Sequence, residues 1–133
     1  DISNYERPLG ETSSSGDTVV NQLSDTRNVS YIFRQDELYK IEDSRTYSDK
    51  KEIKVATDAC VSYIKLFSAH PREISTESGQ KHYVVLLEDR ILELIITKDR
   101  EAENTVIVLQ STSRVHGPRA ETEEFALRVK HGS

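Results

Sequence analysis

Two nearly continuous apolar runs of six residues each, separated by only three polar residues, limit how this 133-residue chain can fold. The runs cover 82–87 and 91–96, and residues 88–90 between them are typical of a tight turn. A third run, 105–109, follows a charged loop. β-Branched and aliphatic runs with short connections favour neighbouring antiparallel strands. The sequence therefore predicts an antiparallel β-meander.

Alternation along these strands places apolar side chains on both faces of the predicted sheet. Val84 and Leu86 point to one face, and Tyr83, Val85 and Leu87 point to the other. A sheet that is apolar on both sides needs a cover on each side. Any apolar surface that the covers leave exposed is a candidate docking surface or ligand pocket.

The most regular helical pattern follows Asp49, a favourable N-cap residue with Glu52 three positions later. Apolar residues then recur at intervals of three and four, so that they share one helix face. These residues are Ile53, Ala56, Cys60, Ile64 and Phe67. Pro71 disfavours helical geometry at the residue before it and ends the pattern. We expect one long amphipathic helix over 49–67, packed on one face of the sheet.

Two further patterns complete the expected architecture, an α+β fold. Residues 31–33 and 38–41 are rich in β-branched and aromatic side chains and predict one or two short strands. Gly117 and Pro118 precede a short C-terminal helix that continues through Val129, since proline is favourable in the first turn of a helix. The expected fold is an antiparallel β-meander packed on one long helix, with a short C-terminal helix.

The first 28 residues carry proline, glycine, a serine run and few apolar side chains. Such composition indicates an irregular N-terminal arm. The chain is therefore divided into an arm, 1–28, and a single α+β domain, 29–133. Two roles for the arm stay open: a flexible tail, or a segment that orders against a partner or against the domain's own sheet.

Charge and cysteine content exclude several function classes. The chain has 18 basic and 23 acidic residues, and a net charge of −5 disfavours nucleic-acid binding. No apolar run approaches the ~20 residues that a membrane-spanning helix needs. Cys60 is the only cysteine, so an intrachain disulfide is excluded. Its place on the apolar helix face indicates a core residue.

The sequence contains no recognisable catalytic, cofactor or metal motif. Its four histidines lack the spacing of a metal site, and its five glycines are too dispersed for a phosphate-binding loop. We therefore predict no catalytic residues, no metal ligands and no cofactor. An active site built from residues far apart in the sequence would leave no motif. The missing motifs therefore disfavour an enzyme but do not exclude one.

One polar segment stands out because it follows an apolar strand and precedes the C-terminal helix. It provides Ser111, Ser113, Arg114 and His116. An arginine beside hydroxyls and near a helix N-terminus is suited to binding a carboxylate or phosphate. The alternative is that Arg114 pairs with an acid on a neighbouring strand, such as Glu88 or Glu93.

The same segment carries a family resemblance. Residues 87–117, which end Ser-Thr-Ser-Arg-Val-His-Gly, resemble the domain-of-unknown-function 1499 family of bacterial envelope and plastid proteins. The helix over 49–67, the acidic turn 88–90 and the segment 125–128 are similar to corresponding parts of that family. The resemblance implies an envelope or plastid protein without an established activity. A lumenal subunit of a photosynthetic membrane assembly is one form that it implies.

The start of the chain agrees with such a location. The sequence begins Asp1-Ile2-Ser3 and contains no methionine, as a chain does after removal of a targeting peptide. A fragment of a longer chain would begin in the same way. We expect an extracytoplasmic or organellar protein, in the periplasm or envelope or in the plastid lumen.

Three functions are ranked on these grounds. The first is a non-catalytic accessory or interaction subunit with a protein partner, open to peripheral association with a membrane complex. The second is a domain that binds a small apolar or anionic ligand, with Arg114 as the polar anchor. The third is an enzyme with a dispersed site. A flat apolar patch would favour the first, an enclosed pocket of several hundred cubic ångströms the second, and converging titratable groups the third.

Overall fold

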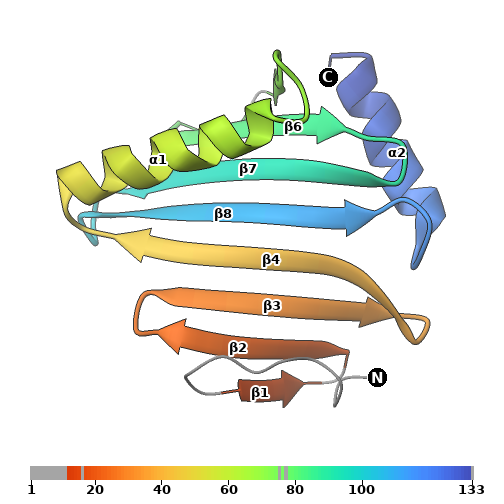
Figure 1. The fold of residues 1–133 in the computed structure, drawn as a ribbon, viewed down its shortest axis with the longest axis horizontal. Helices are drawn as coiled ribbons and strands as arrows, with labels where there is room; N and C mark the ends of the chain where they lie inside the picture. Colours follow the sequence, from red (N-terminus) through yellow and green to blue (C-terminus); the bar gives the residue numbers. More distant parts are fainter. Residues whose placement is uncertain (1–11, 16, 75, 77, 133) are drawn as a thin grey trace.

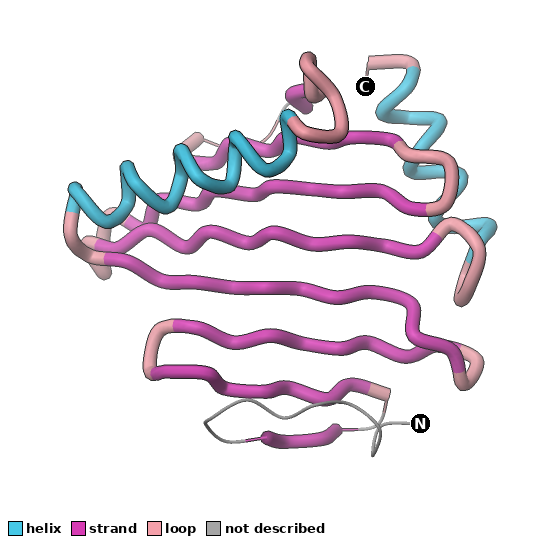
Figure 2. Tube along the Cα trace, in the orientation of Figure 1, coloured by secondary structure: helices cyan, strands magenta, loops and turns pink. Residues whose placement is uncertain are grey.

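The computed structural model describes residues 12–15, 17–74, 76 and 78–132, which form an antiparallel sheet and two helices (Figures 1 and 2). The sheet has eight strands in the order β1-β2-β3-β4-β8-β7-β6-β5. In chain order the elements are β1 (Thr12–Ser15), β2 (Thr18–Ser24), β3 (Arg27–Arg34), β4 (Glu37–Tyr47), α1 (Lys50–Lys65), β5 (Arg72–Ile74), β6 (Gln80–Leu86), β7 (Arg90–Asp99), β8 (Asn104–Ser113) and α2 (Arg119–Lys130). The predicted α+β class and antiparallel sheet are confirmed. Within the described residues, no helix is long and apolar enough to cross a membrane.

Two runs of antiparallel strands meet in the middle of the sheet. Strands β1 to β4 follow one another from one edge, and β5 to β8 follow one another from the other edge. β4 and β8 join the two halves, with Asp43 opposite Leu109. α1 connects the halves along the chain and crosses one face of the β6–β8 half, whereas α2 lies at one end of that half (Figure 1).

α1 begins at the cap that the sequence provides. The Asp49 carboxylate accepts the backbone N–H of Lys51 at 2.8 Å. The buried residues of the helix and the sheet residues beneath them form one cluster: Ala56, Cys60, Ile64, Val85, Leu92, Leu94 and Ile107. The helix ends at Lys65, and the N–H groups of Leu66 and Phe67 close one further turn onto the carbonyls of Tyr63 and Ile64.

Cys60 lies in this cluster with only 6% of its surface exposed. Burial raises the pKa of its thiol, with a smaller opposing effect from the charge of Arg45. A thiol with a raised pKa holds its proton at neutral pH and is a poor nucleophile. Cys60 is therefore a core residue.

The opposite face of the same strands is covered by α2. Ala126 and Val129 of this helix pack against Val84 and Ile91 of the sheet. Val85, the next residue along β6, belongs instead to the cluster beneath α1. The two apolar faces of this half of the sheet thus each have a helix against them.

The prediction of an irregular N-terminal arm over residues 1–28 is wrong for residues 12–15 and 17–28, the part of the arm that the structure describes. β1, β2 and the start of β3 lie there and extend the sheet beyond β4. Val19 and Asn21 of β2 are buried. Polar residues such as Asp25 lie in the turn that joins β2 to β3, because tight hairpin turns use the same residue types as loops. Residues 1–11 of the predicted arm lie outside the described residues.

The hairpin formed by β3 and β4 is much longer than the short strands predicted over 31–33 and 38–41. Its loop consists of Gln35 and Asp36, whose φ angles are 54° and 62°. Two central residues with positive φ match a type I′ turn, which suits the twist of antiparallel strands. Asn-Gly is the usual sequence for this turn, so Gln35-Asp36 is only a weak indication of a two-residue hairpin in the sequence.

Candidate ligand-binding cavity

The structure places Arg114 at the junction between β8 and α2. Its guanidinium forms two hydrogen bonds with the carboxylate of Glu123, of 2.9 and 2.7 Å, and a third with the carbonyl oxygen of Leu87, of 2.8 Å. The hydrogen bonds between the two side chains raise the pKa of Arg114 and lower the pKa of Glu123. The acid that pairs with Arg114 lies on α2 and is neither Glu88 nor Glu93. Through these hydrogen bonds Arg114 connects α2 to the turn between β6 and β7.

The other predicted site residues form a separate group. The Ser113 hydroxyl accepts the backbone N–H groups of Val115 and His116, at 3.1 and 2.8 Å, and so shapes the turn after β8. His116 contacts the carboxylate of Glu37 through Nδ1. Ser111, Ser113 and His116 line a shallow hollow of about 200 Å³. Arg114 lines a different hollow beside α2, so the structure does not bring the four predicted residues into one site.

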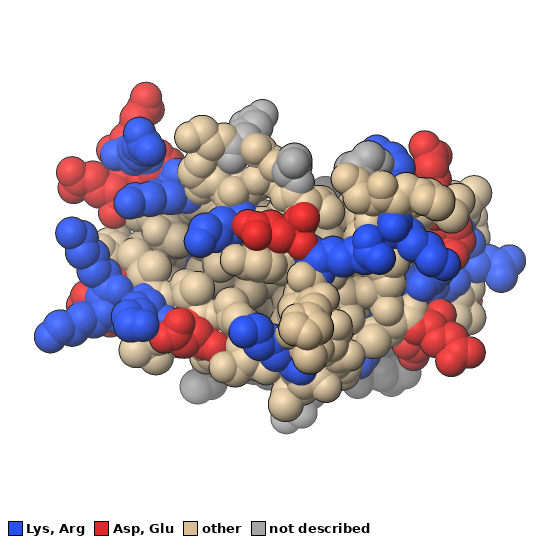
Figure 3. Space-filling model, turned by 90° about the horizontal axis from the view of Figure 1, so that it is seen from above, with Lys and Arg blue, Asp and Glu red and all other residues tan. Residues whose placement is uncertain are grey.

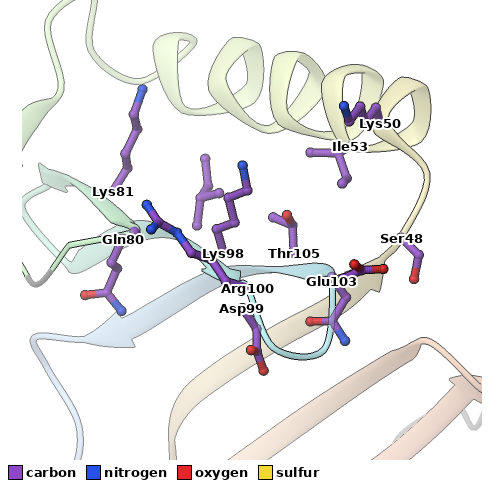
Figure 4. A pocket seen from close by; sticks show the side chains of 13 residues that line it. Ser48, Lys50, Ile53, Gln80, Lys81, Lys98, Asp99, Arg100, Glu103 and Thr105 are labelled. Carbon is purple, nitrogen blue, oxygen red and sulfur yellow. The ribbon is translucent and has the colours of Figure 1, made fainter.

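A much larger cavity, of about 840 Å³, lies between the first turn of α1 and the ends of β6, β7 and β8 (Figure 4). Ile53 of α1 and Ile96 of β7 provide its main apolar surface. Thr105 of β8, which is 5% exposed, contributes a buried hydroxyl to the lining. The volume falls within the range of small-molecule sites in proteins.

Four basic side chains surround this cavity: Lys50, Lys81, Lys98 and Arg100. Lys81 and Lys98 extend from the sheet toward the side on which α1 lies, whereas Asp99 points away (Figure 4). None of the four forms an ion pair with another residue in the described part of the chain.

Two acids also line the cavity, but one of them is already engaged. The Asp99 carboxylate accepts the backbone N–H groups of Glu101 and Ala102, at 3.1 and 3.2 Å. Glu103 is the other acid. Seen from above, basic and acidic side chains both crowd the end of the molecule at which α1 begins (Figure 3). The cavity therefore carries an excess of positive charge in a chain whose net charge is −5.

Local sequence explains how these residues come together. β4 ends at Tyr47 and α1 begins at Lys50, so the first turn of the helix starts directly above the strand ends. Gly79 has a φ of 85°, which favours glycine, and its carbonyl accepts the N–H of Lys98 at 2.8 Å. This turn brings the start of β6 beside the end of β7, so that Lys81 and Lys98 share one face.

The described lining of the cavity contains no histidine and no cysteine. Within the residues that the structure describes, no group of three or more His, Cys, Asp and Glu side chains could hold a metal ion. The lining residues are spread from Ser48 to Thr105, so the sequence offered no local motif for this site, and residues 98–104 resemble an ordinary solvated loop.

Comparison with known proteins gives no relative. No protein-family model matches this chain, and no curated protein and no solved structure matches it either. The resemblance to the domain-of-unknown-function 1499 family therefore stays a prediction from the residues alone.

Proposed function

We propose that this protein is a binding module for a small amphipathic anion, which occupies the cavity between α1 and the sheet. One observation carries the proposal: four basic side chains that have no ion-pair partner among the described residues surround a cavity of about 840 Å³ that also exposes isoleucine side chains. The expected ligand has an anionic group, such as a carboxylate, and an apolar body.

The free energies expected for charge attraction and for apolar burial indicate that both parts of such a ligand contribute to its affinity. A unit charge about 4 Å from an anion contributes roughly 1 kcal/mol in water and up to about 4 kcal/mol near a protein surface. Burial of about 100 Å² of apolar ligand surface contributes roughly 2.5 kcal/mol. Entropy lost on binding offsets part of this gain. The charge and the apolar body are therefore both needed for appreciable affinity.

The test compares octanoate with octan-1-ol by isothermal titration calorimetry at low ionic strength. We expect octanoate to bind at least about tenfold more tightly, because only its carboxylate attracts the basic side chains. A Lys81→Ala/Lys98→Ala double variant is expected to lose about tenfold or more in octanoate affinity, and added salt to weaken binding of the wild type.

Lys51→Ala is the matched control for charge. Lys51 lies beside Lys50 at the start of α1 but does not line the cavity. This variant should bind octanoate within about twofold of the wild type, since its charge is exposed and screened. Equal affinity for octanoate and octan-1-ol, or no octanoate binding at millimolar concentration, would refute the proposal.

A second candidate function, an interaction subunit with a protein partner, is supported by the outer surface of α1. Val55 is 69% exposed, Leu66 is 79% exposed and Tyr63 is 40% exposed. Their spacing of eight and three residues places them along one side of the helix. Large apolar side chains gathered on a surface mark candidate protein contacts.

A further inference from the structure

A second cavity, of about 230 Å³, lies between α2 and the sheet. Its sheet residues include Ile91 of β7 and Thr112 of β8, which lie opposite each other in register. Ile91 packs in the cluster beneath α2, whereas the larger cavity adjoins α1 on the other face. The two cavities share no lining residue, so this site does not depend on the function proposed above.

A buried carboxylate forms one wall of this cavity. Glu93 is 6% exposed. One of its oxygens accepts a hydrogen bond from the Gln110 side-chain amide at 3.0 Å, and the other lies 2.6 Å from Nε2 of His82. Register places Glu93 directly opposite Gln110 on adjacent strands. His82 is the neighbour that can act as counter-ion, and the two side chains form an ion pair when the imidazole is protonated.

A buried hydroxyl of the same cavity has no partner. Thr112 is 5% exposed, and its Oγ1 makes no hydrogen bond in the described structure. Thr112 is two residues from Gln110 on β8, so both side chains point to the same face as Glu93. Buried polar atoms are nearly always hydrogen-bonded, and an exception calls for a missing partner.

The rest of the lining offers more acceptors than donors. Glu121 adds a second carboxylate, while Ile91 and Phe125 add apolar surface. Lys40 is the one basic residue of the lining, and its Nζ lies 5.8 Å from the centroid of the Tyr39 ring.

The Tyr39 hydroxyl is already hydrogen-bonded to the Thr122 hydroxyl at 3.0 Å, and its oxygen keeps some capacity to accept a further hydrogen bond. The acceptors that a ligand can use in the cavity also include the remaining lone pairs of Glu93, the Thr112 hydroxyl and the Glu121 carboxylate.

We propose that this cavity binds a small primary amine that carries an apolar or aromatic body. An ammonium group has three N–H donors and no acceptor, so it can serve both Glu93 and Thr112. Its positive charge is attracted by the two carboxylates of the cavity lining, Glu93 and Glu121. The apolar body packs between Ile91 and Phe125.

The experiment uses 2-phenylethylamine as the probe and 2-phenylethanol, which has the same body without the charge, as its comparison. We expect isothermal titration calorimetry to show the amine binding at least about tenfold more tightly than the alcohol. Glu93→Gln keeps the size of the side chain and removes its charge, and it should weaken amine binding by about tenfold or more.

Thr112→Val provides a second, uncharged test that replaces a hydroxyl by a methyl group of similar size. It should weaken amine binding severalfold, and it decides the question if Glu93→Gln does not fold. Glu124→Gln on α2 is the control for loss of one negative charge, since Glu124 does not line the cavity, and it should leave the affinity unchanged.

Binding of the amine that is weakened by neither Glu93→Gln nor Thr112→Val would overturn the proposal, as would equal affinity for the amine and the alcohol. A wild-type protein that binds no amine at millimolar concentration would also overturn it and would leave ordered water as the partner of Thr112. The Lys81→Ala/Lys98→Ala variant should keep its amine affinity, which separates this site from the anion cavity.

Discussion

At the scale of single residues, the half-buried carboxylate of Asp43 is neutralised by two arginines on the sheet, Arg27 and Arg45. Arg27 of β3 donates to the Asp43 carboxylate at 3.2 and 2.8 Å, and Arg45 of β4 donates at 3.4 and 3.3 Å. Burial alone would raise the pKa of Asp43, but hydrogen bonds and charge from the two arginines outweigh burial and lower it. The negative charge of Asp43 in turn offsets the repulsion between the guanidinium groups of Arg27 and Arg45.

Asp43→Asn is expected to lower the free energy of unfolding at neutral pH by roughly 1 kcal/mol, because the arginines are only partly buried. A carboxyl whose pKa is lower in the folded state stabilises the protein above its ordinary pKa, and this contribution is lost as pH falls through the folded value. The ordinary pKa of Asp43 is 3.8. The stability difference between wild type and variant should therefore stay constant above about pH 5 and shrink below about pH 4.

Urea unfolding at a series of pH values measures this difference. Asp58→Asn is the control, since Asp58 is exposed and pairs with Lys54 in the same helix. It should change the stability by much less than Asp43→Asn does. A stability difference that persists unchanged at about pH 2 would show that the charge of Asp43 is not what stabilises this group.

Sequence reasoning succeeded at this scale where a residue's role depends on its near neighbours. The Asp49 cap and the burial of Cys60 both follow from local periodicity. It failed where the role depends on a distant partner. Arg114 pairs with Glu123 because α2 folds back beside the turn after β6, and no spacing along the chain shows this fold-back.

At the scale of elements, α2 is held against the sheet by contacts at both of its ends. Near its start, Glu123 pairs with Arg114 and the Thr122 hydroxyl bonds Tyr39 of β4. At its end, Arg72 of β5 donates to the carbonyl oxygens of Val129 and Lys130, at 3.2 and 3.1 Å. The Val129 carbonyl also accepts the N–H of Gly132, at 3.1 Å, so Arg72 adds to the C-terminal capping of the helix.

Gly117 sets the path of the chain into α2. Its φ is 76°, and a Cβ added there would lie 2.5 Å from Cδ1 and 2.9 Å from Cγ of the Tyr39 ring. Gly117→Ala should lower the free energy of unfolding by about 2–4 kcal/mol, because a left-handed backbone costs about 1–2 kcal/mol and the clash adds to it. Urea unfolding measures the loss.

Gly79→Ala is the matched control for this effect. Gly79 has a similar φ of 85°, but an added Cβ would have only an ordinary contact, at 3.4 Å from the carbonyl oxygen of Lys98. This variant should therefore show the backbone cost alone. If the two variants are equally stable, the Tyr39 ring moves aside without cost and does not fix the start of α2.

Elements were predictable from the sequence only where hydrophobic pattern and length agreed. The apolar runs of β6, β7 and β8 are long and nearly continuous, and they indicated neighbouring strands. β1 and β2 are rich in serine, threonine and asparagine, and their strand structure comes from pairing with a neighbouring strand rather than from an apolar pattern. The tertiary context therefore outweighed the composition of the N-terminal segment.

At the scale of the whole molecule, the sheet is wider than the two helices that cover it. α1 and α2 both lie against the half built from β5 to β8, while β1, β2 and β3 form the other edge without a helix among the described residues (Figure 2). The sequence could not predict the anion cavity, because its basic residues are contributed by α1, β6, β7 and the loop after β7. Only the topology brings these four parts together.

The exposed side of α1 leads to a prediction about assembly. If Val55 and Leu66 contact a protein partner, the native protein should elute in a larger assembly during size-exclusion chromatography with light scattering, and a Val55→Ser/Leu66→Ser variant should elute near 15.2 kDa. Both side chains are mostly exposed, so their replacement should change the stability of the isolated protein by no more than about 0.5 kcal/mol.

The Lys81→Ala/Lys98→Ala variant, whose changes lie in the cavity, should keep the assembly intact. Elution of the native protein near 15.2 kDa would remove the interaction-subunit function and leave ligand binding as the function that the cavity supports.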